Sequence, residues 1–270
     1  MINFLHTFIP QAVAFSAGPL TIHWYGICIV LGIAAALLVV VYFGKAQGVS
    51  SDQIFDAAFY VIIFGIVGAR LYSICLDWTY YLAHPEQLVA VWNGGLAIHG
   101  AILGGSAALV VYAYKKKQSF WRWADLAVLG LPVGQALGRV GNYFNQEIFG
   151  LPTSLPWGIP ISPEFRPTAY QQFEYFHPTF LYEALLDVLN FLILALVFKP
   201  LAIRHSPPAG RLFLIYLINY SVIRIVMEQL RIDAAPEIVN IRWPIIFSGA
   251  LLLAALAGLV FSRKTKSPVV

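Results

Sequence analysis

Residues 21–43 form the first long apolar stretch of the chain and read TIHWYGICIVLGIAAALLVVVYF. A helix needs about 20 apolar residues to cross the hydrocarbon core of a bilayer, so this stretch predicts a transmembrane helix. Further stretches lie at about 53–74, 95–114, 123–143, 178–198, 211–229 and 244–262. The chain is therefore predicted to be an all-α membrane protein, a bundle of seven transmembrane helices forming a single domain over residues 1–270.

Composition also favours a membrane protein. Of the 270 residues, 59% are hydrophobic and only 11% are charged, whereas a soluble domain carries about 25% charged residues. Such a chain cannot solvate its own surface, so lipid is expected to cover much of it. Cys28 and Cys75 lie within apolar stretches and lack the spacing of a disulfide framework or a metal site. We predict no metal and no cofactor.

Lysine and arginine residues predict the orientation, because positively charged loops stay in the cytoplasm. Eleven basic residues fall on one side of the seven-helix arrangement, and only Arg166, Arg231 and Arg242 fall on the other. The eleven are Lys45, Lys115, Lys116, Lys117, Arg122, Lys199, Arg204, Arg211, Arg263, Lys264 and Lys266. The N-terminus is thus predicted outside and the C-terminus in the cytoplasm. The net charge of +4 follows this pattern, so no nucleic-acid partner is expected.

Two segments do not fit a membrane span. Residues 144–177 are rich in proline, glycine and aromatic residues and are predicted to form a small extracytoplasmic cap inserted in the domain. Residues 77–92, DWTYYLAHPEQLVAVW, are too polar and too short to span, and they fit an interfacial helix or loop. The predicted topology therefore places both segments on the outer side.

Three arginines remain inside the predicted spans: Arg70, Arg139 and Arg224. An arginine within a span costs about 2.5–3.5 kcal/mol on insertion scales. In the oriented arrangement all three fall in the outer half of the membrane, together with other polar residues. These are Tyr25, His99, Glu183, Glu228 and Arg231, the last two on the same helical face as Arg224. Ion pairs such as Arg224–Glu228 could account for single residues, but the convergence suggests a site for a phospholipid head group, because guanidinium groups suit phosphate.

Glycines recur every four residues in two predicted helices, a spacing that favours close helix packing. They are Gly100, Gly104, Gly130, Gly134 and Gly138. On the fifth predicted helix Glu183, Asp187 and Asn190 share one face, which is expected to point into the bundle. The two deeper residues of this face, Asp187 and Asn190, are interpreted as structural.

Residues 138–150 read GRVGNYFNQEIFG and resemble the signature of the prolipoprotein diacylglyceryl transferases, which is close to GRxGNFxNxExxG. Tyr143 replaces the phenylalanine of that pattern. Further segments similar to the family follow in the right order: HWYG at 23–26, GGLAIHG at 94–100, HP at 177–178, LYE at 181–183, and Arg224 with Glu228 and Arg231. The cap is short for the family, and residues 240–244, NIRWP, lack its Gln/Ser pattern.

The resemblance implies an enzyme of the bacterial inner membrane with several spans. Such an enzyme moves the sn-1,2-diacylglyceryl group of phosphatidylglycerol to the lipobox cysteine thiol of a prolipoprotein and releases glycerol 1-phosphate. Its partners would be phosphatidylglycerol, the lipobox peptide and the lipid bilayer. The predicted catalytic residues are Tyr25, His99, Arg139 and Arg224, and the predicted substrate-binding residues are Asn142, Glu147, Gly150, Glu183 and Glu228.

The chemistry suggests roles for these residues. Thiolate is the nucleophilic form of cysteine, and His99 is a candidate base, although a hydrogen bond to a neighbouring helix is the alternative reading. Arg139 and Arg224 would stabilise the leaving phosphate, with Glu147 and Glu228 as their partners. Arg70 matches none of the family segments, so its loss is expected to affect folding more than turnover.

Other classes of protein are alternatives. A membrane transporter or flippase for an anionic lipid or solute would need a midplane site and often shows inverted repeats, whereas this chain has no repeat and its polar residues lie toward one leaflet. A metal-dependent phosphatidyltransferase would need clustered aspartates, which are scattered here. A lipid-binding scaffold without catalytic activity is the third alternative.

Overall fold

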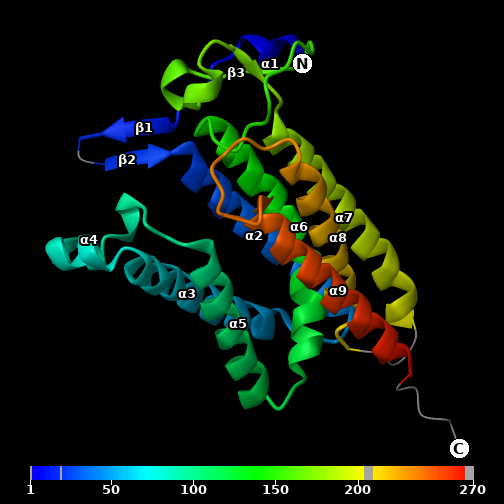
Figure 1. Ribbon diagram of the computed structural model, residues 1–270. Coiled ribbons are helices and arrows are strands. Elements are labelled where there is room, and N and C mark those ends of the chain that lie inside the picture. Colours follow the sequence, from blue (N-terminus) through cyan, green and yellow to red (C-terminus); the bar gives the residue numbers. More distant parts are fainter. Residues whose placement is uncertain (1, 19, 204–208, 265–270) are drawn as a thin grey trace, which may run out of the picture. The chain divides into compact units, whose positions relative to one another are not determined.

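The structure is a computed structural model that describes residues 2–18, 20–203 and 209–264, and it is mostly helical (Figure 1). Each of the predicted spans coincides with a long helix. The long helices are α2 (Trp24–Ala46), α3 (Ser51–Leu76), α5 (Ile98–Lys115), α6 (Phe120–Phe144), α7 (Thr179–Ile203), α8 (Arg211–Glu228) and α9 (Trp243–Lys264). The short ones are α1 (Ile2–Thr7), α4 (Trp78–Ala83) and the 3-10 turns η1 (Pro85–Leu88), η2 (Val91–Asn93), η3 (Pro163–Phe165) and η4 (Thr168–Tyr170).

The protein is mostly helical, as predicted, and short antiparallel hairpins that were not predicted lie between the helices. They pair β1 (Val13–Ala17) with β2 (Leu20–His23), β3 (Ile159–Pro160) with β4 (Tyr175–Phe176), and β5 (Glu237–Ile238) with β6 (Ile241–Arg242). Residues 20–23 belong to β2, so the first long helix begins at Trp24 and not at 21. Residues 77–92 form α4 and the two 3-10 turns after it, in agreement with a helix or loop at that place.

Within the described residues, four helices are long and apolar enough to cross a membrane: Trp24–Ala46, Ser51–Leu76, Thr179–Phe198 and Trp243–Phe261. The other three long helices, α5, α6 and α8, do not meet the combined conditions of length, hydropathy and low charge; α8 carries three charged residues, Arg211, Arg224 and Glu228. Seven crossings and the orientation of the termini therefore remain predictions. Arg204 and Lys266, which contributed to the predicted orientation, lie outside the described residues.

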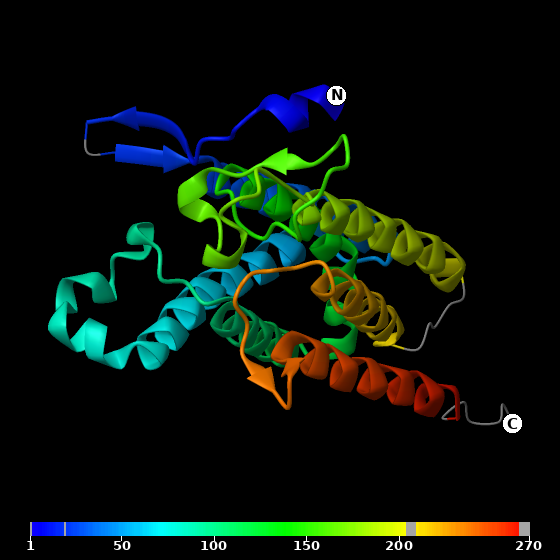
Figure 2. The same cartoon turned by 45° about the horizontal axis from the view of Figure 1, so that its top comes forward.

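The chain divides into two compact units, which we describe separately. The larger unit comprises Met1–Val39 and Ala127–Val270. In it α8 packs against both α7 and α9 (Figure 2). The first part of α2 meets α6 where Gly32 faces Gly134: a Cβ atom added to Gly32 would lie 3.0 Å from the Gly134 oxygen. The predicted close packing of glycines is confirmed at this position.

Residues 144–177 fold over the end of α6 in the same unit. An apolar cluster holds this segment together, and α1 packs against its strand β3. The buried members of the cluster are Tyr143, Phe149, Ile159, Ile161, Phe176 and Phe180. The segment is thus a small packed layer at the point where α6 ends and α7 begins, which is where the signature GRVGNYFNQEIFG lies.

The smaller unit comprises Val40–Leu126. Its helix α3 begins with a capping box, in which Ser50 accepts from the backbone of Gln53 and the Gln53 side chain accepts from the Ser50 backbone. Helices α3 and α5 pack against each other closely, because a Cβ atom on Gly68 would collide with the Gly100 oxygen and lie 3.0 Å from the Gly104 Cα. The predicted role of Gly100 and Gly104 in helix packing is confirmed.

Candidate functional site

The signature of the larger unit ends α6 and forms a tight turn around Glu147. Asn142 and Asn145 both donate side-chain hydrogen bonds to Glu147 Oε1, at 2.9 and 3.0 Å. On either side of Glu147 the backbone enters the left-handed region, with φ of +51° at Gln146 and +55° at Ile148. That conformation is strained for a β-branched residue. The turn therefore holds an exposed carboxylate in a fixed place, and the predicted pairing of Glu147 with an arginine is replaced by pairing with amides.

Two glycines of the signature make close contacts that explain their presence. A Cβ atom on Gly141 would lie 2.8 Å from Cδ2 of the Tyr25 ring, so α6 lies directly against that tyrosine. Tyr25 is within electrostatic range of both Glu147 and Arg139. Gly150 is enclosed by Thr179, His177 and Leu230, each of which would come within 2.9 Å of a Cβ atom at this position, and its backbone pairs with Arg231. The signature is thereby joined to the segment that follows α8.

A carboxylate on α7 joins two arginines. Glu183 is only 3% exposed, and its Oε2 lies 2.6 Å from Nη2 of Arg139 on α6. Its other oxygen lies 3.3 Å from Nη1 of Arg231. Asp187, one turn further along α7, is buried and within electrostatic range of Arg139 and Glu183. Glu183 therefore positions Arg139 and does not remain free for a ligand.

A second carboxylate, Glu228 on α8, also serves two arginines. Its Oε2 lies 2.7 Å from Nη2 of Arg224, one turn earlier on the helix, and its Oε1 lies 2.9 Å from Nε of Arg242. These contacts are ionic and lie outside hydrogen-bonding directions. The predicted partnership of Arg224 and Glu228 is confirmed, whereas Arg242 was assigned by its sequence position to topology alone.

The segment after α8 differs from the predicted arrangement. Helix α8 ends at Glu228, so Arg231 does not continue its face. Instead Arg231 binds Asp233 through two nitrogens, at 2.7 and 2.9 Å. Arg242 donates to the backbone oxygens of Arg231 and Asp233 at 2.5 and 2.6 Å. Sequence reasoning missed the roles of Asp233 and Arg242. The signal that could have indicated them was that Arg231 and Arg242 lie on the side predicted to carry few basic residues.

The pKa of Asp233 reflects this arrangement. Burial alone would raise the pKa of this carboxyl, but the hydrogen bond from Arg231 and the charges of Arg231 and Arg242 outweigh it, so the pKa lies below its ordinary value. The arginine-rich segment between α8 and α9 is therefore held by a charged carboxylate at neutral pH.

The four arginines of this ion-pair network, Arg139, Arg224, Arg231 and Arg242, fall into two groups. Arg231 and Arg242 use Nε and both terminal nitrogens in contacts with their own chain. Within the described residues, Arg139 and Arg224 each make one ion pair, through Nη2. Their side chains are 22% and 16% exposed. A guanidinium has five N–H donors, so Arg139 and Arg224 keep donors that can bind an oxyanion, while the other two fix the surrounding chain.

A cavity of about 310 Å³ lies over the signature turn, with Glu147, Ile148, Phe165 and Asp233 among its lining residues. It combines apolar walls with two carboxylates, one held by amides and one by arginines. Among the described residues no group of histidine, cysteine, aspartate and glutamate could hold a metal ion.

The remaining predicted catalytic residue, His99, belongs to the smaller unit. It is the second residue of α5, its side chain is exposed, and its ring centroid lies 5.9 Å from that of Tyr72. Arg70 of the same unit is 6% exposed and is surrounded by backbone oxygens of its own chain. The structure thus brings together Tyr25, Arg139 and Glu183 with the signature in one unit, and places His99 with Arg70 in the other.

These features define a helical membrane protein with a buried arginine–carboxylate network and donors suited to an anionic group. A sequence model of the prolipoprotein diacylglyceryl transferases matches residues 12–261. The chain belongs to this family.

Individual relatives agree with the family assignment. Relatives from three bacteria are named phosphatidylglycerol–prolipoprotein diacylglyceryl transferase. The relative from Trichormus variabilis is 40% identical over 261 residues, which cover 96% of this chain and 92% of the relative. The one from Synechococcus elongatus is 43% identical over 80% of this chain and 75% of the relative. The one from Thermotoga maritima is 38% identical over 94% of this chain and 85% of the relative.

Proposed function

We propose that the protein transfers the diacylglyceryl group of phosphatidylglycerol to a cysteine of a prolipoprotein. The observation that carries the proposal is the family match over residues 12–261, with relatives of that name 38–43% identical to this chain. The finer reaction is the one implied by the sequence resemblance. The thiolate of the lipobox cysteine attacks the sn-3 carbon of the diacylglyceryl group, a C–S bond forms, and the C–O bond to phosphate breaks. Glycerol 1-phosphate leaves, and the thiol proton is passed to a base.

Arg139 and Arg224 bind the phosphate in this proposal. Both keep guanidinium donors beyond their ion pairs, and both are anchored by buried carboxylates. Charge builds up on the phosphate oxygens as the C–O bond breaks. Preorganised donors stabilise that charge more in the transition state than in the bound lipid, which is the condition for raising the rate.

The other residues of the larger unit support this pair. Glu183 and Glu228 set the positions of the two arginines, and Gly150 permits the close contact that joins the signature to Arg231. Glu183 and Glu228 were predicted to bind substrate, and we now assign them to positioning.

Tyr25, Asn142 and Glu147 are proposed to contact the head-group glycerol. The Asn142 amide already donates to Glu147, which leaves its carbonyl and the second carboxylate oxygen to accept from hydroxyl groups. The Tyr25 ring is fixed against Gly141, so its hydroxyl can serve as a donor of defined position.

His99 is proposed as the base that takes the thiol proton. Histidine is the side chain that most often serves as a general base in enzymes. The side chain is exposed at the start of α5, where a peptide thiol can reach it.

The proposed setting is the bacterial inner membrane, crossed seven times, with the N-terminus and residues 144–177 outside. The four helices apolar enough to cross a membrane support the location, and the distribution of lysine and arginine supports the orientation. Labelling of single cysteines introduced in the cap, in intact cells, is expected from the outside only. Labelling of the cap only from the cytoplasm would reverse the orientation and the leaflet from which the lipid comes.

A direct assay tests the reaction. Purified protein in detergent is incubated with phosphatidylglycerol carrying labelled acyl chains and a lipobox peptide, and the products are analysed by mass spectrometry. We expect a peptide with a thioether-linked diacylglyceryl group, equimolar glycerol phosphate, and no product from a peptide with serine in place of cysteine. Hydrolysis of the lipid or no turnover with an active, folded preparation would overturn the proposal.

A further inference from the structure

We propose that Arg70 is a positioning residue for His99, because its guanidinium fixes the segment that leads into α5. The proposal rests on the function proposed above, in which His99 takes the thiol proton. It departs from the expectation that loss of Arg70 affects folding more than turnover.

The guanidinium of Arg70 is enclosed by the chain that follows α3. Among the described residues it has six oxygen acceptors, which are the backbone oxygens of Gln87, Leu88, Ala90, Gly94 and Gly95 and the hydroxyl of Tyr81. The contacts from Nη1 to the Gly94 and Gly95 oxygens measure 2.7 and 2.8 Å. Five N–H donors meet six acceptors, so Arg70 has no donor left for a lipid phosphate.

The segment around Arg70 needs a hydrogen-bond donor for its carbonyl groups. Residues 84–97 contain only the short 3-10 turns η1 and η2, which leave many carbonyl groups without a partner in regular structure. Carbonyl groups turned away from water require hydrogen bonds, and a planar guanidinium can serve several of them at once. Lysine, with a compact ammonium group, cannot reproduce this geometry.

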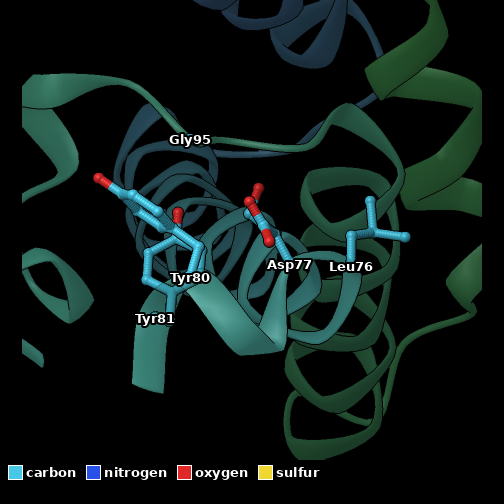
Figure 3. A pocket seen from close by; sticks show the side chains of 6 residues that line it. Leu76, Asp77, Tyr80, Tyr81 and Gly95 are labelled. Carbon is cyan, nitrogen blue, oxygen red and sulfur yellow. The ribbon is translucent and has the colours of Figure 1, made fainter. Parts of the chain in front are cut away.

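Gly95 is the point at which the segment meets Arg70. Its φ is +68°, and a Cβ atom there would lie 2.5 Å from both Arg70 Nη1 and the Tyr81 hydroxyl. Figure 3 shows the backbone at Gly95 above Tyr80, Tyr81 and Asp77, which with it line a cavity of about 300 Å³. Only glycine brings the carbonyl this close to the guanidinium.

Three successive contacts fix the chain between Gly95 and the residue that follows His99. The Gly95 oxygen is bound by Arg70, the Ala97 amide donates to the Ala69 oxygen at 3.2 Å, and Gly100 packs against Gly68. His99 therefore lies within a stretch that runs along α3 in a fixed register.

The start of α5 depends on this register. Its N-cap residue, Ala97, provides no side-chain hydrogen bond to the first turn of the helix. A helix start without a capping side chain is set by the chain before it, and here that chain is held by Arg70. Release of Gly94 and Gly95 would shift the first turn and with it the imidazole.

A double-mutant cycle distinguishes positioning from general stability. The transfer assay is run on Arg70→Lys, Gly95→Ala, His99→Gln and the double variant Arg70→Lys/His99→Gln. We expect each of the first two to lower kcat by about 10–100-fold, because displacement of a catalytic group by about 1 Å has effects of that size. KM for phosphatidylglycerol should stay near the wild-type value. The double variant should be no slower than His99→Gln, since residues acting through one group are not additive.

Two matched controls belong to the same unit. Gly48→Ala introduces a side chain at φ +70° with nothing within 4 Å, and Arg122→Lys alters another arginine that donates to a backbone oxygen, that of Gln47. Both should keep kcat near wild type. If Arg70→Lys slowed the His99→Gln enzyme by the same factor as the wild type, or if His99→Gln were fully active, the positioning role would be wrong.

Hydrogen exchange tests the clamp without reference to catalysis. Amides of residues 84–97 should exchange faster in Arg70→Lys and in Gly95→Ala than in wild type, while α9 stays protected. Unchanged protection would overturn the clamp. A wild-type protein without transferase activity would overturn the proposed function, and the exchange result would still decide whether Arg70 holds the segment. Gly95→Ala keeps the arginine and its charge, so it serves if Arg70→Lys fails to fold.

Discussion

Replacement of Arg139 probes the proposed phosphate site most directly. In Arg139→Ala the ligand loses the donors on Nε and Nη1, for which the described part of the chain shows no ion pair. Hydrogen bonds to charged groups contribute about 1.5–3 kcal/mol each, so two bonds correspond to about 3–6 kcal/mol and a loss of about 10²–10⁴-fold in kcat/KM. Arg139→Lys keeps a positive charge beside Glu183 and offers a single point of contact, so a smaller loss of about 10–100-fold is expected.

The assay must separate binding from folding. Steady-state transfer of labelled diacylglyceryl groups to a lipobox peptide gives kcat and KM, and thermal unfolding in detergent gives stability. Arg231 provides a matched control, because it shares Glu183 with Arg139 but uses Nε and both terminal nitrogens in contacts with its own chain. Arg231→Lys should lower the unfolding temperature more than Arg139→Lys does. Near wild-type turnover of a folded Arg139→Ala enzyme would refute the phosphate-site reasoning and leave the network a purely structural one.

Three other changes have defined outcomes. A Cys28→Ala, Cys75→Ala enzyme should keep wild-type transfer rates, because the reacting thiol belongs to the peptide; complete loss of activity with the fold intact would indicate a covalent enzyme intermediate. Asp233→Asn should lower the unfolding temperature at pH 6, and the difference from wild type should shrink below about pH 4. The reason is that the folded protein lowers the pKa of Asp233, so the stability this carboxylate contributes is present above the pKa of the unfolded state and is lost as the pH falls through the pKa of the folded state. A difference in unfolding temperature that stayed constant between about pH 3 and pH 6 would contradict this. Gly150→Ala places a methyl within 2.9 Å of three neighbours and should cost about 1–3 kcal/mol of stability, whereas Gly249→Ala, with nothing within 4 Å, should be neutral in the same melting experiment.

Sequence reasoning located the helices because hydropathy over some twenty residues is a strong and local signal. It failed at residues 21–23, which belong to the strand β2, because so short an alternation of polar and apolar residues cannot be separated from the apolar run that follows it. The hairpins elsewhere consist of two-residue strands, which are too short to leave a periodic pattern.

Most residues of the candidate site could be predicted from the sequence, whereas most of the contacts between them could not. Arg224 and Glu228 were paired in advance because both lie on one helix at a spacing of four. Arg242 and Asp233 were missed, since their contacts depend on how the chain turns after α8. The glutamate of the signature was expected near an arginine and is held by two asparagines, because a strained turn directs it back toward α6.

The three long helices outside the set of four apolar ones share a further property with consequences for biogenesis. Each packs on a helix apolar enough to enter the bilayer alone: α5 on α3, α6 on α2, and α8 between α7 and α9. A segment carrying a charged residue partitions poorly from the translocon into lipid unless a neighbour shields that charge. In the proposed seven-helix arrangement, helices α6 and α8, which carry Arg139 and Arg224, are therefore expected to leave the translocon only beside their apolar neighbours, so that the residues proposed to bind phosphate also constrain how the nascent chain enters the membrane.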